Sequence, residues 1–340
     1  MLPLVMMLLS LTTVHELESA PPQPKLIAHT RLDGAAYDLY ALEYPNARVL
    51  PTGISDNRKV VGEVYLDEAS IPVLWTLHTA RILPHNGMQI VTARAISHSG
   101  RYIAGWIGWV HDKPSSSGAL WHVDGVKAAQ PILVGNMPVA VNDRGEVAGV
   151  EFGRGGRLAY VWRSPHQPGT FLGTLGSGNE STPMSINDNG MVVGYSWTKN
   201  NVERAFMYSK GTMRDLAACR GERLTEAIGV DNVGDVVGHS GSHAVRWLAR
   251  GSLKVLPDLG YGAFAASVNG RYIVGNCRAK SGRPDAVLWN AGALEDLNDL
   301  NGIDSLGVHL WEASDVDSRG DIIGAMTYQK RKDGFLLIRE

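Results

Sequence analysis

Eleven residues of the sequence could contact a ligand, and they form two chemical groups. Exposed tryptophans suit contacts with carbohydrates or peptides. Mixed acids, cations and polar side chains could bind a polar ligand, or carry out acid–base chemistry where two acids face each other. Packing and ordinary solvated charge are the alternative interpretations. The residues are Trp106, Trp109, Trp197, Trp311, Glu63, Glu226, Glu312, Arg94, Arg223, His239 and Asn276.

Other short motifs have the wrong spacing for catalysis or metal binding. Gly-His-Ser-Gly at 238–241 lacks the spacing of a nucleophile elbow. The glycine-rich stretch 173–178 precedes a predicted strand, whereas a phosphate site needs the start of a helix. Residues 315–321 have calcium-like oxygen spacing without the closing glutamate. Cys219 and Cys277 form no metal-binding pattern, so we expect no metal and no cofactor, and their pairing stays open.

The elements that must position these residues come from one recurring unit. It begins with a small, a β-branched and a polar residue, passes through a turn, and ends with two apolar residues and glycine. A spacing of about 44 residues is typical of a four-stranded blade, so the repeat predicts an all-β, seven-bladed β-propeller of four-stranded antiparallel blades. The seven glycines are Gly62, Gly105, Gly149, Gly194, Gly238, Gly275 and Gly324.

Each unit is predicted to supply four strands. A polar residue ends the first strand and caps the following turn rather than binding a ligand. The repeat glycine ends the second strand, where we expect it to allow close approach between sheets. The turn residues are Asn142, Asn187, Asp231, Asn269 and Asp317. The third strand ends in a large residue that should pack between blades, namely Trp75, Trp121, Trp162, Tyr208, Trp247, Trp289 or Leu337.

The four candidate tryptophans fall outside that third-strand position. We expect them in loops after the second strand or before the first, which converge on one face around the central channel. The charged and polar candidates are predicted to lie on the same face. A ligand site is therefore expected at the mouth of the channel.

The ends of the chain depart from the repeat. Residues 2–11 form an apolar run that is shorter than the roughly 20 residues of a membrane span. The run fits a secretory signal, although no Lys or Arg precedes it. We therefore predict a signal-like segment and linker at 1–25 and a single propeller at 26–340. Residues 37–42 resemble the fourth strand that the last unit lacks, so they are predicted to close the last blade.

The repeat resembles the HAF-repeat family of predicted extracellular repeat proteins. The resemblance is carried by Gly-Thr-Leu-Gly at 173–176, Ser-Ile-Asn-Asp-Asn-Gly-Met-Val-Val-Gly at 185–194, Ala-Phe-Met-Tyr at 205–208 and Gly-Thr-Met-Arg-Asp-Leu at 211–216. It implies a propeller and a secreted, periplasmic or extracellular location. It implies no activity, because the family has no agreed catalytic motif.

Charge and composition limit the partners. The chain carries 32 basic and 34 acidic residues with no block of like charge, so no nucleic-acid partner is expected. The sequence favours an exported binding or interaction protein for a small molecule, carbohydrate or protein at the channel mouth. The alternative is a hydrolase or lyase that acts on a carbohydrate or small polar substrate through acids on the same face. Whether the protein is an enzyme stays open.

Overall fold

The structure is a computed structural model that describes residues 21–66, 69–85, 88, 90–108, 117–153, 156–164, 167–200 and 202–340. We number the repeat units 1 to 7 along the chain. Unit 1 holds β3 (Arg48–Ile54), β4 (Val60–Leu66), β5 (Ala69–Trp75) and β6 (Ala80–Ile82). Unit 2 holds β7 (Ile90–Ile96), β8 (Tyr102–Gly108), β9 (Ser117–Asp124), β10 (Lys127–Ala128) and β11 (Ile132–Leu133). Unit 3 holds β12 (Met137–Val141), β13 (Val147–Gly153), β14 (Gly156–Trp162) and β15 (Thr170–Gly173).

The remaining units follow the same order. Unit 4 holds β16 (Glu180–Ile186), β17 (Val192–Trp197), β18 (Glu203–Ser209) and β19 (Thr212–Asp215). Unit 5 holds β20 (Thr225–Val230), β21 (Val236–Ser240), β22 (His243–Trp247) and β23 (Leu253–Val255). Unit 6 holds β24 (Ala263–Asn269), β25 (Tyr272–Arg278), β26 (Pro284–Asn290) and β27 (Ala293–Asp296), followed by the 3-10 turns η1 (Leu297–Asp299) and η2 (Asp304–Leu306). Unit 7 holds β28 (His309–Val316), β29 (Ile322–Tyr328) and β30 (Arg331–Arg339).

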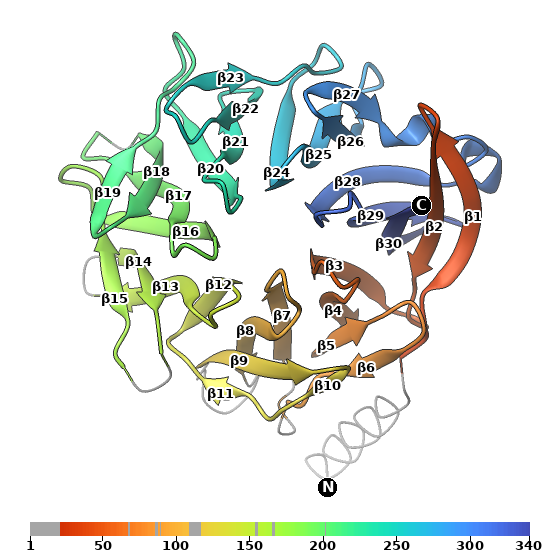
Figure 1. Ribbon diagram of the computed structural model, residues 1–340, viewed down its shortest axis with the longest axis horizontal. Helices are drawn as coiled ribbons and strands as arrows, with labels where there is room; N and C mark the ends of the chain where they lie inside the picture. Colours follow the sequence, from red (N-terminus) through yellow and green to blue (C-terminus); the bar gives the residue numbers. More distant parts are fainter. Residues whose placement is uncertain are drawn as a thin grey trace, which may run out of the picture.

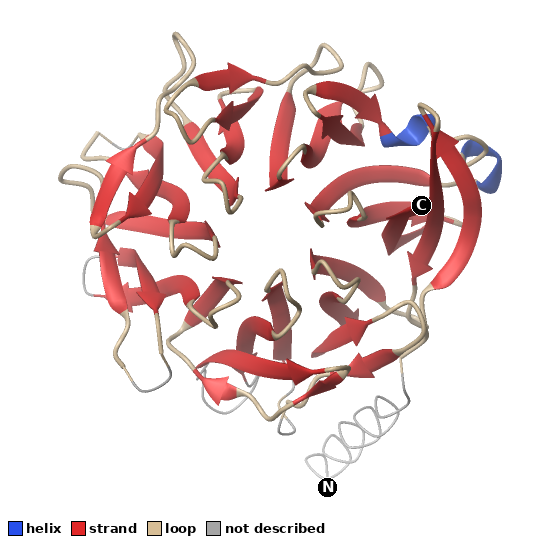
Figure 2. Cartoon of the chain, viewed as in Figure 1, coloured by secondary structure: helices blue, strands red, loops and turns tan. Residues whose placement is uncertain are grey.

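The sheets are arranged around a common centre, with the first strand of each unit innermost (Figure 1). Strands account for most of the described chain and the two 3-10 turns are short (Figure 2). Units 3 to 6 are separate four-stranded sheets, whereas units 1 and 2 form one sheet through a single parallel bridge between Ser70 and Ile90.

The N-terminal strands belong to the sheet of the last unit. β1 (Lys25–Leu32) pairs with β2 (Ala35–Leu42), and β2 pairs with β30 in a register that runs from Tyr37 opposite Arg339 to Leu42 opposite Gly334. The two ends of the described chain therefore share one sheet, seen as red strands beside blue ones in Figure 1. Buried apolar residues of β2 and β30 pack in common cores.

The turns link neighbouring units as well as capping themselves. Asn187 Oδ1 accepts hydrogen bonds from the backbone N–H groups of Asn189 and Met191, both at 3.0 Å. Its Nδ2 donates to the Asp231 carbonyl of the next unit at 2.8 Å. Asn142 Nδ2 donates to the Asn187 carbonyl at 3.0 Å. The predicted capping is confirmed at this turn, and the bond between units is an addition that the sequence did not reveal.

Unit 6 departs from this arrangement because its turn is shorter. Asn269 Nδ2 is buried without a hydrogen-bond partner, so the amide donor that links Asn187 to the next unit makes no such bond in unit 6. Other side chains make the connections there. Arg246 donates to the Gly270 carbonyl at 3.1 Å, and Arg339 donates to the Tyr272 hydroxyl at 2.9 Å.

The first strand of every unit carries a β-bulge next to the repeat glycine. In unit 4, Met184 is the extra residue between Pro183 and Ser185, and Pro183 pairs with Gly194. The other six units have the equivalent shift. A Cβ on Gly194 would lie 2.0 Å from the Thr182 carbonyl oxygen. The glycine is therefore required by a neighbouring strand of its own sheet, which corrects the predicted contact between sheets.

The predicted third-strand residues are all buried, and several also bond to the preceding unit. Three indole N–H groups donate to carbonyl oxygens in the segment that leaves that unit. The bonds join Trp121 to Pro84 (2.8 Å), Trp247 to Ala217 (2.6 Å) and Trp289 to Pro257 (2.7 Å). Apolar packing thus holds the units against one another, and in units 2, 5 and 6 these bonds add to it.

Candidate functional site

The described candidate tryptophans lie in strands. Trp106 lies within β8, Trp197 ends β17 and Trp311 lies within β28, so the prediction that they lie in loops is wrong. The second strands continue past the repeat glycine because they keep pairing with their neighbours, as Trp106 does with Thr92. Trp109 lies outside the described residues.

Several candidates nevertheless lie at the same position along the strands of their units, which we call one level of the ring. Those that directly follow a repeat glycine are Glu63, Trp106, His239 and Asn276. Each faces a residue of the first strand of its unit, and Glu226 is the residue opposite His239. Glu312 takes the corresponding first-strand place in unit 7. The common register thus places these residues at corresponding positions along their strands.

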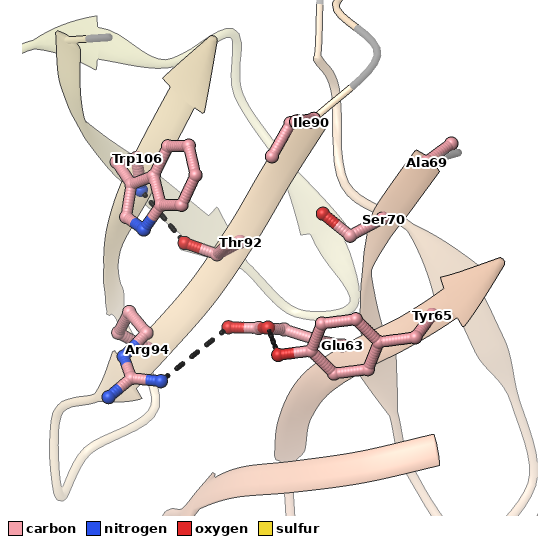
Figure 3. Close-up of a pocket in the computed structure, with 8 residues that line it drawn as sticks. All are labelled: Glu63, Tyr65, Ala69, Ser70, Ile90, Thr92, Arg94 and Trp106. Carbon is pink, nitrogen blue, oxygen red and sulfur yellow. Dashed lines mark hydrogen bonds and ion pairs between the residues drawn. The ribbon is translucent and has the colours of Figure 1, made fainter. Parts of the chain in front are cut away.

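A cavity of about 350 Å³ opens at this level between units 1 and 2 (Figure 3). It brings together the three predicted residues Glu63, Arg94 and Trp106. We call it the unit 1–2 pocket. Its lining consists of Glu63, Tyr65, Ala69, Ser70, Ile90, Thr92, Arg94 and Trp106.

Glu63 is the electrostatic centre of the unit 1–2 pocket. Its residue surface is only 1% exposed. One carboxyl oxygen, Oε2, accepts a hydrogen bond from the Tyr65 hydroxyl. The other, Oε1, is buried without a hydrogen-bond partner and lies 3.9 Å from Arg94 Nη1. Burial raises the pKa of Glu63, although the Tyr65 hydrogen bond and the Arg94 charge oppose the rise.

Arg94 reaches this acid from β7, the first strand of unit 2, which lies beside unit 1. The register of β7 shifts between Ala93 and Ala95, so Arg94 is the extra residue of the strand. Its side chain enters the pocket together with those of Thr92 and Ile90, the alternate residues that precede it in β7. In Figure 3 the guanidinium points toward the Glu63 carboxylate across the boundary between the two units.

Sequence reasoning missed Tyr65, Ser70 and Thr92. Tyr65 is two residues after Glu63, and strand alternation places such residues on one face, so this signal was available. The same signal was available for Thr92, which is two residues before Arg94, whereas Ser70 enters the pocket beside its bridge partner Ile90 and could not be found in that way. Burial and the adjacent Glu63 raise the pKa of Tyr65 to about 12.

An equivalent cavity of about 270 Å³ lies between units 5 and 6, and Asn276 is the one described candidate that lines it. Phe264 occupies the place that Thr92 has in the unit 1–2 pocket. Its ring meets the His239 ring edge-on, with centroids 4.9 Å apart. The pocket lining is Ser242, Tyr261, Gly262, Phe264, Asn276, Arg278, Gly282 and Pro284.

His239 also belongs to a titratable cluster with two acids. Its Nε2 lies 3.4 Å from Glu226 Oε2. The bond from His239 lowers the pKa of Glu226. Burial and the nearby Glu226 carboxyl raise the pKa of Glu203 to about 7. Trp197 pairs across the strands with Glu203, so it lies beside this cluster rather than in the unit 1–2 pocket.

The remaining candidates line neither cavity. Glu312 is partly buried, and burial raises its pKa against the opposing charge of Arg48. Trp311 buries its indole N–H without a hydrogen-bond partner. Arg223 is exposed before β20.

The cysteines and metal-binding groups give no further site. Cys219 and Cys277 are free. Among the residues that the structure describes, one group could bring three ligand atoms within 4.8 Å of each other, namely His29, Asp38 and Glu340. His29 and Glu340 are exposed, so the group alone does not indicate a metal.

Similarity to known proteins is limited to the fold. No family model and no curated protein matches the sequence, so the resemblance to the HAF-repeat family stays a prediction. The β-propeller domain of the Trilobed protease from Pyrococcus furiosus is 11% identical, with a TM-score of 0.55 over 82% of this chain and 95% of that one. YCF48 from Cyanidioschyzon merolae is 12% identical, with a TM-score of 0.52 over 88% and 97%.

A third solved structure, acylaminoacyl peptidase from Pyrococcus horikoshii, is 11% identical with a TM-score of 0.57. The match covers 86% of this chain and 52% of the peptidase, so this chain spans about half of the peptidase's length. These similarities establish that the chain has an all-β fold of the β-propeller type. Within the described residues, the helices are too short to cross a membrane.

Proposed function

We propose that residues 26–340 form one seven-bladed propeller and that β2 closes its last blade. Seven bulged first strands support the blade count. Pairing of β2 with β30 supports the closure. A further bond between Ser318 and Asp56 joins unit 7 to unit 1 at 2.9 Å, as expected for a closed ring. The apolar run at 2–11 supports export, and N-terminal sequencing of the mature protein tests it.

Within this ring, we infer that the protein binds a small polar ligand in the unit 1–2 pocket. The observation that carries this inference is Glu63 Oε1, a buried acceptor without a hydrogen-bond partner at the wall of a cavity. Such an atom is costly in the free protein, and a ligand that donates to it recovers the missing bond. Among the described residues that line the pocket, Glu63 is the one carboxyl group.

A thermal-shift screen of the full chain against a chemically mixed small-molecule library tests this function. A ligand of the folded state raises the melting temperature by mass action. We expect at least one ligand whose shift is lost in Trp106→Ala and in Glu63→Gln. Asn276→Ala is the matched control, because it changes the residue at the Trp106 position of another unit. Hits that persist in both pocket variants would contradict the assignment.

A specific observation also favours the second candidate, a hydrolase or lyase. Glu203 and Glu226 have pKa values displaced in opposite directions beside His239, which suits a general acid and a general base. A panel of chromogenic glycosides and lactones tests this candidate. Turnover lost in Glu226→Gln and retained in Glu63→Gln would support catalysis at the cluster, and absence of turnover in wild type would argue against it.

A further inference from the structure

The gap between Glu63 and Arg94 has the dimensions of a bridging hydroxyl group. The 3.9 Å between Glu63 Oε1 and Arg94 Nη1 is too long for a direct hydrogen bond. Glu63 Oε1 is closed to solvent in the free protein, so the half-exposed Arg94 side chain has to turn aside slightly before a hydroxyl oxygen can lie at about 2.8 Å from both atoms. It would donate its hydrogen to the carboxylate and accept one from the guanidinium. One atom that both donates and accepts therefore completes the pair.

The charges of the pocket disfavour ionic ligands at this position. A ligand cation would be attracted by Glu63 but would lie against the Arg94 guanidinium. A ligand anion would be attracted by Arg94 but would lie against the Glu63 carboxylate, which also has to keep its bond from Tyr65. A neutral donor–acceptor group meets neither repulsion.

The rest of the lining suits a ring with an apolar face. Trp106 and Ile90 stand on the unit 2 side, and Ala69 faces them from unit 1 (Figure 3). The Ser70 and Thr92 hydroxyls add polar groups between these apolar surfaces. A sugar ring combines C–H faces for the indole with hydroxyls at its edge. The volume of about 350 Å³ lies at the small end of ligand sites, so it suits a short saccharide.

We propose that the unit 1–2 pocket binds a neutral sugar residue, with one ring hydroxyl bridging Glu63 Oε1 and Arg94 Nη1 and the ring face against Trp106. This inference rests on the proposed binding function and gives it a ligand class. It concerns the pocket alone and involves no covalent step.

The test compares matched sugars that differ only in charge. Methyl glycosides of glucose, galactose and mannose are measured with their 2-amino and 6-carboxyl counterparts at pH 7, by saturation-transfer NMR and calorimetry. At least one neutral glycoside should bind about tenfold more tightly than both charged counterparts. Glu63→Gln and Arg94→Gln should each weaken its binding about tenfold. Trp106→Ala should abolish it, and Asn276→Ala should not change it.

The outcomes separate the ligand class from the function. Tighter binding of a charged counterpart, lost in Trp106→Ala, would overturn the neutral-sugar inference and leave the binding function standing. Binding by none of the sugars would also overturn it, and the mixed-library screen would then decide the function separately. Glu63→Gln preserves side-chain shape, so it remains informative if Trp106→Ala fails to fold.

Discussion

His98 is the residue whose charge should control stability near neutral pH. It lies in the turn between β7 and β8, and its Nδ1 is 3.6 Å from Asp188 Oδ2 in the turn between β16 and β17. Asp315 and Asp56 add further negative potential, and the pKa of His98 is raised to about 9, chiefly by its interaction with Asp188. The pair connects units 2 and 4, which are not adjacent in the chain order.

The size of the effect follows from the shift. The folded-state pKa of about 9 exceeds the ordinary value of 6.5. A difference of one in pKa corresponds to about 1.4 kcal/mol, so the charged imidazolium would stabilise the folded state by about 3 kcal/mol. The side chain is 29% exposed, so solvent screening should reduce this to about 2 kcal/mol. Because the pKa is raised, this stability is complete below pH 6.5 and is lost as pH rises through 9.

Urea unfolding of wild type and His98→Gln between pH 6 and pH 10 measures the effect. The difference in unfolding free energy should be about 2 kcal/mol at pH 6 and close to zero at pH 10. His78→Gln, at an exposed position, is the control and should track wild type at every pH. A difference that stays constant with pH, or grows, would show that the imidazolium charge does not stabilise the fold.

Three further predictions concern the ring and the acid pair. Gly194→Ala should lower the unfolding free energy by more than about 3 kcal/mol, because its Cβ would overlap the neighbouring backbone. The control Gly211→Ala should lower it by about 1 kcal/mol, for its positive φ alone. Equal urea midpoints for the two variants would contradict this prediction. A chain that starts at Asn46 lacks β1 and β2 and should melt well below the full chain; identical melting would refute closure by β2. Glu203→Gln should be more stable than wild type above pH 7, because wild type loses stability as pH rises from about 4.5 to 7 and this acid ionises. If the variant is less stable than wild type at pH 8, the repulsion between Glu203 and Glu226 is contradicted.

The repeat could be found from sequence because its signals are local. Asn187 and the following turn residues carry hairpin chemistry within a few positions, and the third-strand aromatics mark burial directly. The positions of Glu63 and Trp106 at one level also follow from their place after a repeat glycine.

The site itself depends on relations that the sequence does not display. Arg94 meets Glu63 only because two units lie side by side, with the alternate residues Ile90, Thr92 and Arg94 of β7 facing unit 1. The spacing of residues within one unit does not say which side chains of the next unit they will meet, so no local pattern specifies this pair. The extent of β8 beyond Gly105 likewise depends on its pairing partners, which is why Trp106 lies in a strand.

A crystal structure of the full chain with its best neutral glycoside tests the central claim most directly. The account predicts a sugar ring against Trp106, with one hydroxyl within hydrogen-bond distance of both Glu63 Oε1 and Arg94 Nη1. A glycoside bound instead between units 5 and 6 at Tyr261 and Phe264, with the unit 1–2 pocket holding only solvent, would contradict it.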